Sequence, residues 1–360
     1  MKKIFLTIAV ALTSLMCAGQ ATKVLTAEKS NDYGLVYSLP VTALEIEVTA
    51  SHQVAKKGPF YLYAKKFTGS DKAISEDYEK WQISEIKVRP FGVSDSETQY
   101  VMQLRPGALT SITVDSDGML LAINKDVNAP SKPDAKPGKS TEKVVWPSGN
   151  EYLDFVDEEF VASKSSAKQA QLLAESLMEV RDSKLSLTRG TADAMPADGK
   201  QMELMLASLG QQEAALTAAF TGSVTTEYVT RTFTYVPEGE GEDILFRLSS
   251  FAGFVDADDL SGDPVYLKVE SVNQASLPLD AKGEPKKLPK NAVIYTIPGS
   301  AQVSISTLGK KMYDKEIRMA QFGMVFGLDP LLFTDKKEPS FAVFDPVTGG
   351  LVELGSVSSK

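Results

Sequence analysis

The stretch SAKQAQLLAESLMEVRDSKLSLTRGTADAMPADGKQMELMLASLGQQEAALTAAFT, residues 166–221, is the most informative part of the chain for predicting the fold. Two segments within it place apolar side chains at three- and four-residue intervals, which predicts two helices with one buried face each. The first segment has the apolar residues Ala170, Leu173, Ala174, Leu177 and Val180. The second has Met202, Met205, Leu206, Leu209, Leu216, Ala219 and Phe220, and Gln212 and Glu213 interrupt it once.

The sequence also indicates where the second helix begins and ends. Asp198 can cap the second helix. Gln201, three residues later, can return a side-chain hydrogen bond to the Asp198 amide and complete a capping box. Gly222 suits a left-handed cap at its end. Glycine and proline between residues 189 and 199 force the chain to reverse, so we expect an antiparallel helical hairpin. Its apolar stripes serve either core packing or a partner-binding face.

The sequence before the helices is of β type. Leu44, Ile46 and Val48 alternate with polar residues, which predicts a strand with one wet face. Residues 60–67 have helical spacing, and Asp117-Gly118 is a strong signal for a hairpin turn. Residues 34–124 are therefore expected to form an N-terminal β module with one short helix.

After this module, the Lys- and Pro-rich residues 125–142 predict a linker or a long loop. The helical hairpin region follows at 150–222. The β pattern then resumes over 223–356, where residues 341–354 predict a closing hairpin. The expected fold class is α+β, with two mostly antiparallel β modules and a central antiparallel helical hairpin.

The first nineteen residues read as a signal peptide. Lys2 and Lys3 precede an apolar run, and small residues follow at 17–19. Cys17 leaves lipidation open as an alternative, but the bulky Met16 before it favours plain cleavage. No later stretch reaches the ~20 apolar residues of a transmembrane helix. We expect an exported protein of the periplasm or outer membrane, with no transmembrane segment in the mature chain.

The composition excludes several kinds of chemistry. Cys17 is the one cysteine, so a mature chain without it has no disulfide, thiolate nucleophile or cysteine-based metal site. The net charge is −9, from 38 basic and 47 acidic residues, and no basic stripe is interleaved with aromatic residues. Nucleic acid is therefore not an expected partner.

Two places could hold a reactive or metal-binding group. His52 is the one histidine, and we expect it in a solvated polar loop after a strand rather than in a catalytic role. Calcium prefers several carboxylates in one flexible loop, so the candidate metal ligands are Asp256, Asp258, Asp259 and Asp263. Leu260, Ser261 and Leu267 break the EF-hand pattern, and a capped turn is the alternative. No catalytic residue and no cofactor-binding residue is predicted.

A series of short motifs carries a family resemblance over nearly the whole mature chain. In order these are Val36 to Pro40 with Leu44 to Thr49, Gly58-Pro59-Phe60 with Tyr63-Ala64, Asp198-Gly199 before Gln212-Glu213, Val255 to Pro264, Ala320-Gln321-Phe322-Gly323, and Phe344-Asp345-Pro346 with Thr348-Gly349. Together they resemble the bacterial exported family called domain of unknown function 4831. The resemblance implies a secreted or envelope protein with no assigned activity, and it offers no catalytic residue.

These observations favour a non-enzymatic interaction or scaffold component of the cell envelope with a protein partner. The alternative is a carboxylate-dependent hydrolase acting on carbohydrate or peptide. That alternative requires two acids with displaced pKa values facing each other in a cleft.

Overall fold

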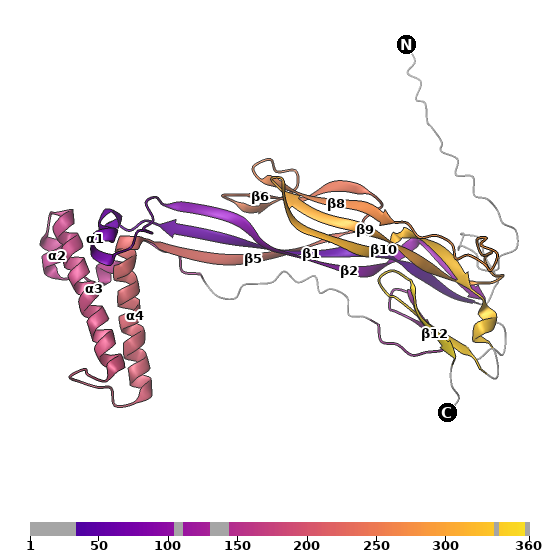
Figure 1. Ribbon diagram of the computed structural model, residues 1–360, viewed down its shortest axis with the longest axis horizontal. Coiled ribbons are helices and arrows are strands. Elements are labelled where there is room, and N and C mark those ends of the chain that lie inside the picture. The colour runs from indigo at the N-terminus through magenta and orange to yellow at the C-terminus, as the bar shows by residue number, and fades with distance from the viewer. Residues whose placement is uncertain (1–33, 104–110, 130–143, 335–337, 357–360) are drawn as a thin grey trace, which may run out of the picture.

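The computed structural model describes residues 34–103, 111–129, 144–334 and 338–356. The expected signal peptide at 1–19 and most of the expected linker at 125–142 lie outside these residues. The molecule is long and narrow, with the helices gathered at one end and the strands forming the body (Figure 1). The helical region, expected to be central, is central in the sequence but terminal in space.

Twelve strands and four α-helices are assigned in the described residues. The strands are β1 Gly34–Lys56, β2 Tyr78–Gln103, β3 Ile112–Val114, β4 Leu120–Ile123, β5 Ser223–Tyr235, β6 Gly241–Ser249, β7 Gly253–Val255, β8 Asp263–Asn273, β9 Val293–Thr307, β10 Lys310–Leu328, β11 Ser340–Phe344 and β12 Leu351–Ser356. The α-helices are α1 Ala64–Thr68, α2 Glu158–Ala162, α3 Ser166–Arg189 and α4 Gly199–Thr221. Short 3-10 helices are η1 Tyr61–Tyr63, η2 Glu151–Phe155 and η3 Pro330–Phe333.

The spine of the molecule is an antiparallel sheet in the order β2-β1-β5. At 23 residues, β1 alone is roughly 75 Å long at the usual rise per residue. Leu44, Ile46 and Val48 are fully buried. On the opposite face the Glu45 carboxylate accepts from Arg89 at 2.7 Å, and the Thr49 and Thr230 hydroxyls lie 2.9 Å apart. The predicted strand with one wet face is confirmed.

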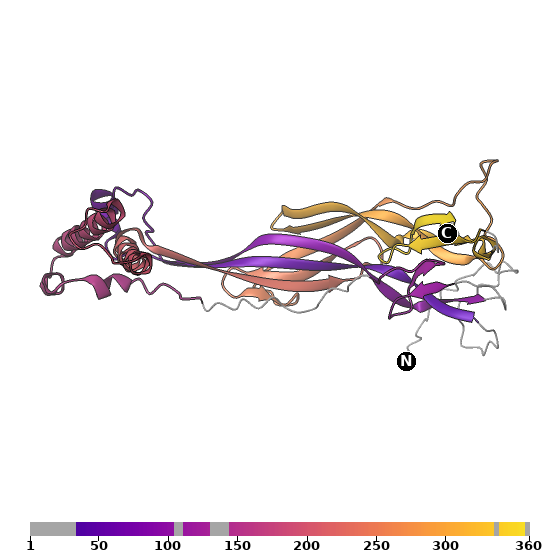
Figure 2. The same ribbon diagram turned by 90° about the horizontal axis from the view of Figure 1, so that it is seen from below.

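A second antiparallel sheet, in the order β10-β9-β8-β6-β7, packs on the buried face of the spine. Alternating apolar residues of both sheets fill the space between them. Phe233 of β5 stacks on Phe246 of β6 with ring centroids 4.8 Å apart. This sandwich is the larger core, and it covers only part of the length of the spine (Figure 2).

A small sheet, β12-β11-β4-β3, covers the spine at the end away from the helices. It joins the two predicted hairpins, because β11 pairs with β4. Since β5 also pairs with β1, the expected modules 34–124 and 223–356 share their sheets and do not form separate β units. The two predicted β modules are therefore joined through shared sheets, because strands from both stretches pair with each other.

Several motifs of the family resemblance meet at the junction of these sheets. The side-chain amide of Gln321 accepts from the Thr42 amide at 3.2 Å and donates to the carbonyls of Thr42 and Pro237 at 2.7 and 3.0 Å. The Thr42 hydroxyl donates to the Val347 carbonyl at 3.0 Å. Thr42 is fully buried, so its polar groups cannot bond to solvent and these hydrogen bonds satisfy them. These motifs therefore have a structural role.

Candidate functional site

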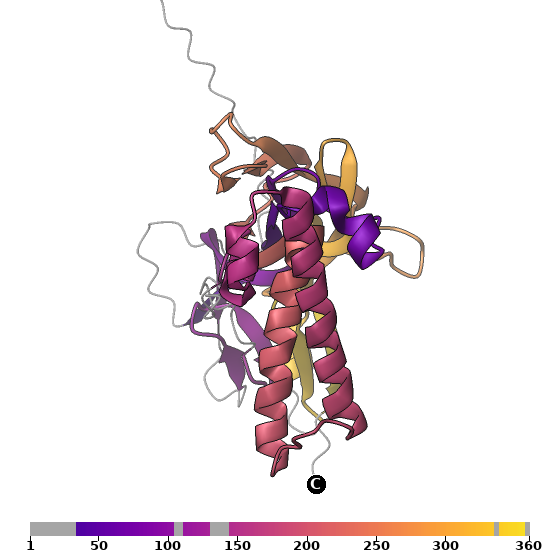
Figure 3. The ribbon, with the colours of Figure 1, turned by 90° about the vertical axis from the view of Figure 1, so that its left-hand side faces the viewer.

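The helical end of the molecule, which we call the tip, is built from two insertions into the spine sheet. Residues 57–77 connect β1 to β2, and residues 144–222 lead into β5. Figure 3 shows α3 and α4 side by side, with the short helices beside their upper ends. The buried residues of the tip are Phe60, Ala64, Tyr152, Phe160, Ala170, Leu172, Leu173, Ala174, Leu177, Leu216, Ala219 and Phe220. Both insertions thus contribute to one core, which includes the expected short helix at 60–67.

Close backbone contacts join the two insertions to each other and place the end of α4 against β1. The Phe60 amide donates to the Ala219 carbonyl at 3.0 Å, and the Ile74 amide donates to the Thr221 carbonyl at 2.9 Å. A Cβ on Gly222 would lie 2.6 Å from the Lys56 carbonyl oxygen. Only glycine allows the backbones of β1 and β5 to approach so closely where α4 ends.

The predicted start of α4 at Asp198 is confirmed, whereas its predicted left-handed cap is not. The Asp198 carboxylate accepts from the Gln201 amide at 2.7 Å, but Gln201 returns its side chain to the Ala197 amide and not to Asp198. Gly222 has a positive φ of 81° with an extended ψ of 175°, so it differs from the left-handed cap that was expected. The left-handed cap belongs to Gly190 at the end of α3.

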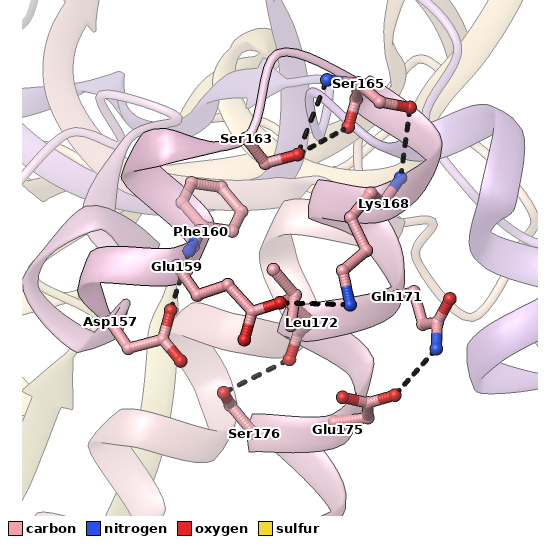
Figure 4. A network of polar contacts seen from close by, with 10 residues as sticks. All are labelled: Asp157, Glu159, Phe160, Ser163, Ser165, Lys168, Gln171, Leu172, Glu175 and Ser176. Carbon is pink, nitrogen blue, oxygen red and sulfur yellow. Dashed lines mark hydrogen bonds and ion pairs between the residues drawn. The ribbon is translucent and has the colours of Figure 1, made fainter.

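A set of polar contacts fixes the bend between α2 and α3 (Figure 4). Asp157 caps α2 by accepting from the Phe160 amide at 2.7 Å. Lys168 in the first turn of α3 pairs with Glu159 of α2 at 3.2 Å. The Gln169 side chain donates to the Phe160 carbonyl at 3.3 Å. These contacts hold α2 against the first part of α3.

Glu213, which interrupts the apolar stripe of α4, pairs with two basic residues of α3 across the hairpin. The Glu213 carboxylate accepts from Arg181 at 2.9 Å and from Lys184 at 3.0 Å, both on α3. The hydrogen bond from Lys184, followed by that from Arg181, holds the pKa of Glu213 below its ordinary value. This group, the Glu213 belt, crosses the α3–α4 contact at the point where the tip core ends.

Beyond the Glu213 belt the hairpin continues into solvent with few buried side chains. Leu187 is buried there, whereas Leu185, Leu204 and Met205 are 43%, 65% and 37% exposed. Helix α3 is about 36 Å long at 1.5 Å per residue, so this distal part projects well past its support. Figures 1 and 3 show α3 and α4 extending beyond α2.

A groove of about 580 Å³ lies between α3 and α4 in this distal part. Its apolar lining includes Leu187, Met205 and Leu209, and Asp182 and Asp193 are its acidic residues. The amphipathic stripes were predictable from the sequence, but this groove was not. Only the helix-to-helix packing shows which part of each stripe stays uncovered.

His52 lies within β1 and not in a polar loop, which corrects the expectation for this residue. Its ring stacks on Trp81 at 4.3 Å and lies 4.7 Å from the Trp146 ring. Its Nε2 is 2.7 Å from a Glu79 oxygen, and its Nδ1 is 3.9 Å from Glu227. The sole histidine and both tryptophans therefore form one cluster on the spine, where Trp146 anchors the chain entering the tip.

The acidic loop between β7 and β8 is a hydrogen-bonded turn. The Asp259 carboxylate accepts from the Ser261 amide at 2.9 Å, and this bond lowers the pKa of Asp259. Arg247 donates to the carbonyls of Ala257 and Gly262 at 2.8 and 3.1 Å. In the described part of the chain, no three His, Cys, Asp or Glu side chains are grouped to hold a metal ion, so Asp256, Asp258, Asp259 and Asp263 do not converge on one point.

Within the described ranges, no helix is both long enough and apolar enough to cross a bilayer. The candidate site is the tip, where the distal groove is lined by apolar side chains of α3 and α4.

Comparison with known proteins gives one finding. Neither the curated proteins nor the solved structures include a significant match. A family model described as Domain of unknown function (DUF4831) matches residues 33–352, nearly the whole chain. The chain therefore belongs to the DUF4831 family.

Proposed function

We propose that this protein is a non-enzymatic interaction component of the cell envelope, exported to the periplasm or the outer membrane, and that it presents the α3–α4 hairpin to a partner protein. The observation that carries this proposal is the distal part of the hairpin, which projects from the end of a long β body with Leu185 and Leu204 exposed. Export is inferred from the signal-like residues 1–19.

The shape of the molecule supports this role. A spine sheet, of which β1 is roughly 75 Å long, separates the tip from the small sheet at the other end. The backbone at Gly222, where α4 ends, lies against the Lys56 carbonyl of this spine. A helical pair at the end of a long sheet is suited to reach a partner away from the β body.

The carboxylates of the chain weigh against the hydrolase alternative. A general acid needs a raised pKa so that it keeps its proton at neutral pH. The described carboxylates with a displaced pKa are Asp77, Glu151, Glu213, Asp259 and Asp314, and each is displaced downward. Hydrogen bonds that favour the charged form account for this direction.

Site-specific photo-cross-linking in intact cells tests the proposal. A photoreactive amino acid placed at Leu185 or Leu204 of the tip is compared with one at Val352 of β12, which is 67% exposed on the body. We expect discrete protein adducts from the two tip positions and not from Val352. Fractionation should recover the adducts with the envelope, and deletion of residues 1–19 should abolish them.

Adducts from Val352 alone, or from none of the positions, would contradict an interaction role for the tip. Turnover of a sugar or peptide substrate that is lost on neutralising one carboxylate would contradict the non-enzymatic role. Adducts that persist in the cytoplasm after removal of residues 1–19 would contradict the envelope assignment.

A further inference from the structure

The distal groove lies on the side of α3 that meets α2 nearer the tip core. Gln169 and Leu172 lie on the side of α3 that meets α2, and Gln169 bonds to the Phe160 carbonyl. Ser183 and Leu187 follow at helical spacing, so they lie on this same side. Since α2 has only five residues, it covers only the first part of α3, and the residues of α3 that line the distal groove come later in the helix.

The distal groove has an apolar floor of adaptable shape. Leu187 is only 5% exposed and forms its base, while Met205 and Leu209 line it from α4. Methionine is unbranched and polarizable, and such residues are common where a surface accepts helices of varied sequence. The apolar side chains of an amphipathic helix would fit this floor.

The charges around the groove select the kind of helix. Asp182 and Asp193 are among its lining residues, and no lysine or arginine is. Arg181 and Lys184 of α3 pair with Glu213 and are not among the lining residues of the groove. An occupant with basic flanks would therefore be attracted, whereas a second copy of this chain carries a net charge of −9.

We propose that the distal groove binds a basic amphipathic helix of a partner protein, with its apolar face on Leu187, Met205 and Leu209 and its lysine or arginine side chains opposite Asp182 and Asp193. This inference rests on the proposed function and specifies its partner. The bound helix completes a three-helix bundle with α3 and α4, in line with α2.

Three synthetic peptides test the inference on the purified mature chain by fluorescence anisotropy. The first repeats a leucine and lysine heptad with one apolar face, the second replaces lysine with glutamate, and the third scrambles the first. We expect the leucine and lysine peptide to bind at least tenfold more tightly than the other two. Because the scrambled peptide has the same charge, it separates groove binding from simple attraction to an acidic protein.

Variants then locate the binding. Met205→Glu should weaken binding of the leucine and lysine peptide at least tenfold, whereas Ala207→Glu, at an exposed position on the same helix but outside the groove lining, should leave it unchanged. Asp182→Lys combined with Asp193→Lys should reverse the preference toward the glutamate peptide. Circular dichroism checks that each variant keeps its helices, and a second groove variant, Ser208→Lys, replaces Met205→Glu if that one unfolds.

Equal binding of the scrambled peptide, or equal effects of the two glutamate variants, would overturn the inference. Sedimentation that shows self-association lost in Met205→Glu would assign the groove to a second copy and would also overturn it. Cross-links from Leu185 and Leu204 that persist in the Asp182→Lys and Asp193→Lys double variant would refute the groove inference and leave the proposed function standing. Absence of all tip cross-links would refute the proposed function itself.

Discussion

Replacing Glu213 with glutamine removes the charge that Arg181 and Lys184 share across the hairpin. Their side chains are 37% and 40% exposed and that of Glu213 is 26% exposed, so solvent screens both pairs substantially. Partly exposed ion pairs contribute about 0.2–1 kcal/mol each, and glutamine retains one acceptor oxygen. We therefore expect Glu213→Gln to destabilise the distal hairpin by about 1 kcal/mol.

Hydrogen exchange measured by residue is the appropriate assay, because the distal hairpin is expected to open without the β core. A loss of about 1 kcal/mol corresponds to roughly fivefold faster exchange of amides that open locally. This increase should appear in the distal turns of α3 and α4 and be absent from β9. The matched control is Glu203→Gln, an exposed glutamate on the same helix.

The effect of Glu213→Gln should also depend on pH. The folded state lowers the pKa of Glu213, so the stabilising contribution is complete above the unfolded pKa of about 4.3 and is lost as the pH falls through the folded value. The difference between wild type and variant should thus be constant near neutrality and shrink below about pH 4. Identical exchange in both proteins at pH 7, or an equal change in Glu203→Gln, would refute this reasoning.

Three further substitutions test the packing of the tip and of the spine. Phe220→Ala removes a fully buried ring from the tip core and should cost about 3–5 kcal/mol in chemical denaturation; a loss under about 1 kcal/mol would contradict the assigned packing. Tyr37→Phe should cost about 1–3 kcal/mol, because the Tyr37 hydroxyl donates to the Ile294 carbonyl at 3.1 Å and accepts from its amide at 2.9 Å, and an unchanged denaturation midpoint would argue against these bonds. Gly222→Ala should lower the melting temperature clearly more than Gly199→Ala does, because a Cβ at Gly222 meets backbone at a positive φ whereas one at Gly199 meets nothing within 4 Å, and equal effects would exclude the close approach.

Local pattern was sufficient for the individual elements. The spacing of apolar residues predicted α3 and α4, Asp198 predicted the start of α4, and Asp117-Gly118 predicted the turn between β3 and β4. Each of these depends on contacts between residues close in the chain, where periodicity, capping and turn preference act directly. The solvent-facing side of β1 was also predictable, because alternation along a strand fixes which side chains share a face.

Pairing between strands distant in sequence could not be predicted from local pattern. No local signal shows that β5 joins β1 or that β11 joins β4, because many strands of similar composition could pair with either. The position of His52 was mistaken because β1 runs far past its first apolar segment, and only pairing with β2 and β5 keeps that polar portion extended.

The sequence by itself determined the helical hairpin, the N-terminal cap of α4 and the strand faces, since these follow from neighbours along the chain. Tertiary structure alone decided that the hairpin stands at the end of a long spine, that Glu213 bridges its two helices, and that a groove beyond Glu213 stays open. The physical reason is that an amphipathic stripe records which side of a helix prefers burial, whereas the length of stripe that is covered depends on segments distant in sequence.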